Sequence, residues 1–212
     1  MRPSPLLRTI IAAIALLALA GCTAKTSTGA RPTAGTGTEA RLQLDALAVA
    51  PARAMTGYSR DRFPHWSDQG GGCNTRDVVL KRDGLNVEAT GQCKIIGGTW
   101  YSVFDGKTFT DPQDVDIDHF VPLANAWRTG ADKWDDAKRK EFANDLIRPQ
   151  LIAVSRASNR AKGDQDPANW KPTNRDYWCE YAARWVAVKY HWQLTITSTE
   201  QRTLADMLAA CP

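Results

Sequence analysis

Polar and apolar residues alternate with a period of two along much of the first half of the chain, which is the pattern of half-buried strands. Short runs of this kind predict strands in three places: Asp77–Leu80, Leu85–Ala89 and Thr99–Phe104. An Asp-Gly pair between Phe104 and Phe109 predicts a hairpin turn. The alternation returns in DVDIDHFVPLA, residues 114–124, which predicts a further strand that Pro122 ends.

Helical spacing replaces the alternation in the second half of the chain. Residues 135–147 predict a helix, with Asp135 as its N-cap and an apolar pair at Phe142 and Leu146. A short buried strand is expected directly after it, at 150–155.

Two more helices are expected near the C-terminus. The first carries an apolar stripe from Trp178 through Trp185 to Trp192, and we interpret these tryptophans as core residues rather than as platforms for stacking bases. The second begins at Ser198, with Gln201 in the capping-box position. Its apolar face carries Leu204, Met207, Leu208 and Cys211. Together these elements predict an α+β domain with modest, irregular sheet content.

The composition is that of one soluble globular domain. The chain has 212 residues, 43% of them hydrophobic, and a formal net charge of +4. This mild positive charge neither demands nor excludes a nucleic-acid partner. Only three histidines are present, and HExxH, GxxxxGK[ST], GxGxxG and GxSxG motifs are missing from the sequence. Their absence argues against zinc proteases, nucleotide or dinucleotide cofactors and serine hydrolases.

The N-terminus predicts an exported protein. A basic start and an apolar core too short to span a bilayer end in Leu-Ala-Gly-Cys, which resembles the bacterial lipobox. We therefore expect a lipoprotein signal peptide at 1–21 and a membrane anchor through lipid on Cys22, with an ordinary signal peptide and a secreted product as the alternative. Residues 22–40 are rich in Thr, Ala and Gly and predict a flexible tether, which places the folded domain at 41–212.

Four cysteines remain for the folded domain, and an even number in an exported chain predicts two disulfides. Three pairings are possible. We favour Cys73 with Cys93 and Cys179 with Cys211, because each pair lies within one local block of sequence. A four-cysteine zinc site would be the alternative use, but no CxxC spacing is present.

The residues that suggest chemistry are Asp118-His119 and the stretch Asn159–Asp164. Hydrolysis of a phosphodiester needs a base to activate water, for which a neutral imidazole is suited. It also needs a divalent cation on oxygen ligands, which one carboxylate and one amide can supply while leaving positions for water and phosphate. Neighbouring side chains of a regular strand point to opposite faces, so we expect the strand to bend or bulge near His119.

These two motifs resemble the ββα-metal (HNH) nucleases. The pair DIDHFVPLA and PQLIAVSRASNRAKGD resembles the secreted HNH endonucleases related to the C-terminal nuclease domain of GmrSD-type restriction enzymes. The HNH domain of the RNA-guided CRISPR nuclease carries a similar pair. The likeness to the secreted family extends from about Tyr58, through TGYSRDRF and GCNTRDVVL, to the Trp-rich C-terminal part. It implies a ββα-metal core at 113–170, with extra N-terminal hairpins and C-terminal helices around it.

The resemblance also implies a role for each motif residue. His119 would be the general base, Asp118 and Asn159 would bind the metal, and Lys162 would lie near the phosphate. The middle Asn of HNH proteins, which braces the loop before the second strand, aligns with Gln150, whose amide is one methylene further from the backbone.

Three arginines are candidate contacts to the substrate: Arg76, Arg128 and Arg160. Ion pairs within the fold, or a solvated surface position, explain them equally well, and the same holds for Lys162. Asp116 lies on the Asp118 side of the strand and is expected to be solvated or ion-paired rather than a metal ligand. We interpret His65 and His191 as structural. His119, Asp118 and Asn159 have structural alternatives as well: a satisfied histidine, a turn cap and a residue near a helix N-terminus.

The sequence therefore predicts a monomeric, extracytoplasmic endonuclease that cuts DNA, or RNA, with a divalent cation, Mg²⁺ or Mn²⁺, and needs no nucleotide cofactor. The family likeness implies products with a 5′-phosphate and a 3′-hydroxyl. Two alternatives stay open: a non-catalytic lipoprotein that binds nucleic acid or protein, and a hydrolase of a cell-wall phosphodiester.

Overall fold

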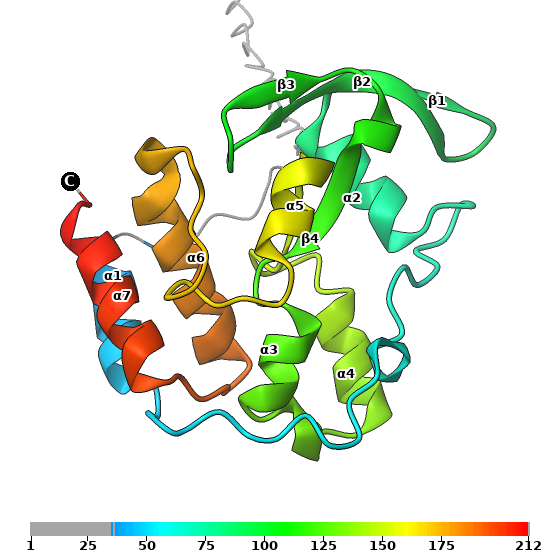
Figure 1. The fold of residues 1–212 in the computed structure, drawn as a ribbon. Coiled ribbons are helices and arrows are strands. Elements are labelled where there is room, and N and C mark those ends of the chain that lie inside the picture. Colours follow the sequence, from blue (N-terminus) through cyan, green and yellow to red (C-terminus); the bar gives the residue numbers. More distant parts are fainter. Residues whose placement is uncertain (1–34, 36, 212) are drawn as a thin grey trace, which may run out of the picture.

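The computed structural model describes residues 35 and 37–211. Helices and strands are mixed, as the α+β prediction requires, and they form two neighbouring halves (Figure 1). One half of the molecule is a group of three helices, α1 (Gly37–Ala46), α6 (Trp178–His191) and α7 (Ser198–Ala209). The second half contains the strands and the shorter helices: α2 (Thr75–Asp83), α3 (Leu123–Arg128), α4 (Asp136–Ala143) and α5 (Arg156–Lys162).

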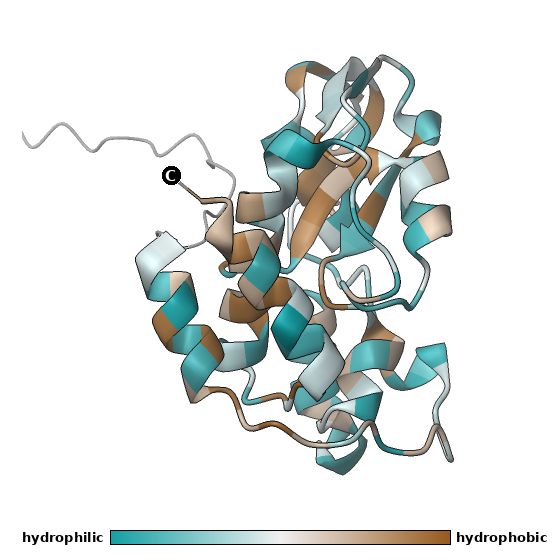
Figure 2. Cartoon of the chain, turned by 60° about the vertical axis from the view of Figure 1, so that its left-hand side comes forward, coloured by the Kyte–Doolittle hydropathy of each residue, from teal (hydrophilic) through white to brown (hydrophobic). Residues whose placement is uncertain are grey.

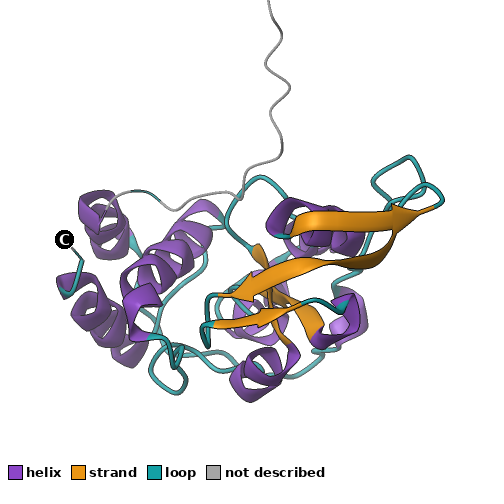
Figure 3. Ribbon diagram, turned by 90° about the horizontal axis from the view of Figure 1, so that it is seen from above, coloured by secondary structure: helices purple, strands orange, loops and turns teal. Residues whose placement is uncertain are grey.

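The five strands form two separate antiparallel sheets. In the first, β1 (Leu85–Thr90), β2 (Lys94–Ser102) and β3 (Lys107–Phe109) follow in chain order, and the predicted turn around Asp-Gly joins β2 to β3. Viewed from above, the β1–β2 hairpin extends away from the three-helix group (Figure 3). The second sheet is the pair β4 (Val115–His119) and β5 (Leu151–Ser155).

The β4–β5 pair is the centre of the second half. Helix α5 starts directly after β5, with the Ser155 side chain as its N-cap, and packs against both strands. All five residues of β5 are buried, which explains why it is an uninterrupted apolar run. In Figure 2 these strands carry the hydrophobic colour between more hydrophilic helices.

Residues 77–80 are helical, so the strand predicted there is wrong. Asn74 caps α2 by accepting a hydrogen bond from the backbone N–H of Asp77, whose side chain accepts one from the Asn74 N–H. This capping box satisfies two donors that a helix start leaves unpaired. A four-residue alternating run also fits one helical turn, and the cap decides between the two.

Three element boundaries also differ from their predictions. Helix α4 starts after Asp135 as predicted but ends at Ala143, four residues before the predicted end. Helix α7 is capped by Thr197 and Glu200, one residue earlier than Ser198 and Gln201. Helix α1 begins at Gly37, inside the segment predicted as a tether, because its buried face packs on α6 and α7.

Both disulfides have the predicted pairing, Cys73 with Cys93 and Cys179 with Cys211. The second one joins the start of α6 to the end of α7, as expected. The predicted signal peptide and Cys22 lie outside the described residues. Within the described part of the chain, no helix is both long and apolar enough to cross a membrane.

Candidate active site

The end of β4 and the outer face of α5 line one cleft with a volume of about 360 Å³. It brings together Asp118, His119, Asn159 and Arg160, which are separated by some forty residues of sequence. The predicted bulge in β4 is absent, because every residue from Val115 to His119 has a partner in β5. Both side chains still border the cleft because it opens at the end of the strand, where the chain turns towards Pro122 and α3.

His119 is held as a neutral base. Its Nε2 donates a hydrogen bond of 2.9 Å to the backbone carbonyl of Ala143, at the end of α4. A carbonyl oxygen can only accept, so Nε2 carries the proton and Nδ1 keeps its lone pair. Burial lowers the pKa of His119 to about 3, with the Ala143 carbonyl opposing the shift. The imidazole is therefore unprotonated at neutral pH, and Nδ1 is the ring atom with a lone pair for a proton.

Asp118 forms a buried ion pair with Lys162. The Nζ of Lys162 lies 2.9 Å from Oδ1 and 2.8 Å from Oδ2 of Asp118, and it also donates to the His119 carbonyl at 3.0 Å. Burial raises the pKa of Asp118, and the lysine charge opposes this rise. Lys162 is fully buried under the carboxylate, so it does not reach the open cleft where we expected it to meet a phosphate.

Asn159 is oriented by Asp116. The amide Nδ2 of Asn159 donates to Oδ2 of Asp116 at 3.1 Å, which leaves the amide oxygen as the free ligand atom. Asn159 and Asp118 both line the cleft. The donor set fits a hard divalent cation, which prefers oxygen ligands and keeps part of its water shell. Among the described residues, no group of three or more His, Cys, Asp or Glu side chains could hold a metal ion.

Gln150 braces the chain where it leaves β4. Its fully buried side chain donates from Nε2 to the Val121 carbonyl at 2.9 Å and accepts from the Val121 N–H at 3.1 Å. The Phe120 N–H adds a bond of 2.7 Å to the Gln150 carbonyl. The Gln150 side chain, one methylene longer than that of Asn, therefore fixes this segment by bonding both the N–H and the carbonyl of Val121.

The three arginines divide into two groups. Arg128 forms an ion pair with Asp164 at 2.7 Å, and Arg76 donates to the carbonyls of Pro112 and Val115, so both take part in contacts within the fold. Burial lowers the pKa of Arg76. Arg160 is exposed at the rim of the cleft, and its side chain has no hydrogen bond or ion pair with another described residue.

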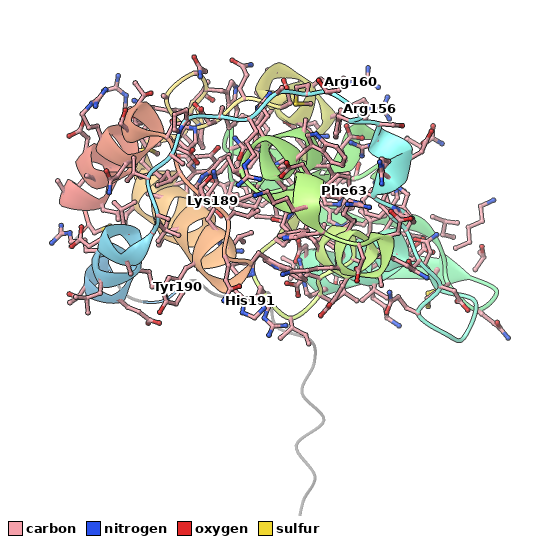
Figure 4. The ribbon with its side chains drawn as sticks, turned by 90° about the horizontal axis from the view of Figure 1, so that it is seen from below. Phe63, Arg156, Arg160, Lys189, Tyr190 and His191 are labelled. Carbon is pink, nitrogen blue, oxygen red and sulfur yellow. A yellow bond between two sulfur atoms is a disulfide. The ribbon has the colours of Figure 1, made fainter. Side chains whose placement is uncertain are left out.

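The remaining aromatic candidates are structural. Trp185 and Trp192 are buried in the core, and Trp178 packs against it, as predicted. His65 bonds the Phe63 carbonyl, and its ring lies 6.1 Å from that of His119. In Figure 4, His191 lies at the opposite edge of the molecule from Arg160, away from the cleft.

Sequence reasoning missed two residues that line the cleft, Tyr58 and Arg60. Both belong to TGYSRDRF, a stretch that contributed to the family likeness without any assigned role. It also missed the carbonyl of Ala143, since a backbone partner of a distant histidine leaves no mark in a sequence.

Comparison with protein families places this geometry in a known group. Residues 75–207 match the family described as GmrSD restriction endonucleases, C-terminal domain. The chain belongs to this family. An uncharacterized secreted protein of the fungus Arthroderma benhamiae is 51% identical to this chain over 168 residues, which cover 79% of this chain and 82% of that protein. No solved structure matches the chain.

The GmrSD C-terminal domain match contains all the motif residues of the cleft, from Asp118 to Arg160. Tyr58 and Arg60 precede the matched range. The GmrSD-type domain of this protein therefore has its cleft completed by an upstream segment.

Proposed function

We propose that this protein is a metal-dependent endonuclease of the HNH type that hydrolyses DNA phosphodiester bonds. One observation carries the proposal: a neutral, carbonyl-anchored histidine shares a cleft with a carboxylate and an amide oxygen. The order β4, β5, α5 fits a ββα-metal core, and membership in the GmrSD C-terminal domain family supports nuclease chemistry.

In this proposal, Nδ1 of His119 accepts a proton from the attacking water. The water oxygen bonds to phosphorus, the bond from phosphorus to the 3′ oxygen breaks, and that oxygen takes a proton from solvent. Asp118 and Asn159 would hold Mg²⁺ or Mn²⁺, which when bound neutralises charge on the phosphate and on the leaving oxygen. The Ala143 carbonyl keeps the imidazole in the tautomer with the proton on Nε2. Asp116 accepts a hydrogen bond from the Asn159 Nδ2, so the Asn159 oxygen points away from Asp116.

Export is part of the same proposal. The N-terminal leader motif predicts it, and the description of the fungal relative as secreted supports an extracellular place of action. A lipobox is a bacterial signal, so a fungal relative lends no support to lipid on Cys22, and the mass of the mature N-terminus would decide that point. The monomeric state is likewise a proposal.

The test is nicking of supercoiled plasmid by the purified, oxidatively folded full chain. We expect nicking with Mg²⁺ or Mn²⁺ and none in EDTA. His119→Ala removes the base and should lower the rate by at least about a hundredfold, because general base catalysis contributes ~10²–10⁴-fold.

Asn159→Ala is a second variant. Asn159 is half-buried on α5, so this substitution should disturb folding less than a substitution in β4. It should raise the metal concentration needed for half-maximal nicking. A folded wild-type chain that leaves plasmid, single-stranded DNA and RNA intact with either cation would contradict the proposal.

A further inference from the structure

Part of the cleft lining comes from the segment with Tyr58 and Arg60. This segment lies before the range that matches the family, and more than fifty residues before the Asp118-His119 motif. Figure 4 shows Arg156 and Arg160 along the edge of the molecule where this segment, drawn in cyan, also runs. The cleft lining therefore contains two cationic side chains, Arg60 and Arg160, from segments a hundred residues apart in the sequence.

The backbone around Arg60 is fixed. Residues Arg60–Arg62 form a short 3-10 turn, η1, which the Ser59 side chain caps through the Asp61 N–H at 3.2 Å. Phe63, directly after the turn, is fully buried against Trp127 and the other core aromatics. A buried anchor next to a capped turn holds the Arg60 backbone in place while its side chain stays exposed.

The Arg60 side chain borders the same cleft as Asp118 and His119. Its side chain forms no hydrogen bond or ion pair with another described residue. A cation that shares the cleft with both residues and has no partner among the described residues is available to an anion bound beside them.

We propose that Arg60 is a catalytic residue that binds a non-bridging oxygen of the scissile phosphate. The inference rests on the endonuclease function proposed above. Arg60 would donate paired hydrogen bonds to the phosphate, on which charge grows as the water oxygen bonds to phosphorus. Arg160, on the α5 side, is placed to contact the neighbouring backbone phosphate.

Arg62 offers a matched control within the same turn. It is also exposed, but its guanidinium pairs with Asp136 at 3.6 Å and lies 5.4 Å from the Trp127 ring centroid. It does not line the cleft. Arg60→Ala and Arg62→Ala therefore remove the same charge from the same turn, and only the first removes it from the cleft.

The experiment measures plasmid nicking at saturating DNA for the full chain and both variants. Arg60→Ala should lower kcat on the order of a hundredfold, the usual cost of losing one donor to the developing charge. Arg62→Ala should stay within about twofold, because Arg62 does not line the cleft and an exposed ion pair contributes little. Low-millimolar guanidinium should restore part of the Arg60→Ala rate and none of the His119→Ala rate, and a merely structural role would not show this rescue.

Failure of this inference can be told apart from failure of the proposed function. A wild-type chain that nicks DNA while Arg60→Ala nicks equally fast would overturn the role of Arg60 and leave the endonuclease standing. Equal losses in Arg60→Ala and Arg62→Ala, without guanidinium rescue, would also overturn it. A wild-type chain that cuts no nucleic acid would overturn both.

Discussion

Lys162 shows how much one residue can depend on its surroundings. Its sequence context, Asn-Arg-Ala-Lys-Gly-Asp, suggests a surface cation, yet its ammonium lies under Asp118 and bonds the His119 carbonyl. Buried charges persist only when paired, so this lysine serves as a built-in counter-ion for the carboxylate and the strand end. The fold keeps Asp118 and His119 in place through this contact.

Replacing Lys162 by Met should therefore destabilise the protein. The change leaves a buried carboxylate and a carbonyl without their partner, and breaking a buried pair in this way costs about 3–5 kcal/mol in the free energy of unfolding. Urea unfolding measures the loss. Added Mg²⁺ should recover part of it, because a cation bound to Asp118 takes over the pairing of the carboxylate.

Lys189→Met is the matched control for this experiment. Lys189 is equally buried and pairs with Glu200 at 2.7 Å, but neither residue lines the cleft. This variant should also lose stability but should gain nothing specific from Mg²⁺. The same response to Mg²⁺ in both variants would contradict our interpretation of Asp118 as a cation ligand.

At the scale of elements, helix α1 is a helix that the sequence pattern did not predict. Its first four residues, Gly37–Ala40, lie in the segment predicted as a tether, and the helix packs on α6 and α7. Ala40 and Leu44 are the buried positions, while Leu42 is exposed. A helix of 10 residues is marginal by itself, so tertiary packing decides whether it forms.

Leu44→Ala should lower the free energy of unfolding by about 2–4 kcal/mol, because it leaves a cavity between α1 and its neighbours. Leu42→Ala, two residues away with 67% of the side chain exposed, should change it by less than about 0.5 kcal/mol. Chemical denaturation of both variants measures the difference. Similar small effects would mean that α1 does not belong to the cooperative core.

At the scale of the whole molecule, stability should depend on pH through His119. Its pKa is about 3 in the folded protein and near the ordinary value of 6.5 in the unfolded chain. Between these values the unfolded chain binds the extra proton, so the contribution of His119 is complete above pH 6.5 and is lost as the pH falls towards 3.

Urea unfolding of the metal-free protein in EDTA between pH 7 and pH 4 measures this dependence. The free energy of unfolding of the wild type should fall more steeply than that of His119→Gln, which has no group that titrates at this position. Parallel curves for the two proteins would show that the imidazole is not held neutral by the fold.

The sequence alone was enough for most features that depend on neighbours along the chain, although it missed the capping box that makes residues 77–80 helical. The period of apolar residues predicted β4, β5 and the two C-terminal helices, the local spacing of cysteines predicted both disulfides, and the Asp118-His119 and Asn159 motifs marked the cleft. The tertiary structure alone decided the rest: the burial of Lys162, the Ala143 carbonyl behind His119 and the approach of Arg60. The reason is physical, since a periodic pattern reports which face of an element is buried but carries no information about which distant backbone or side chain meets that face.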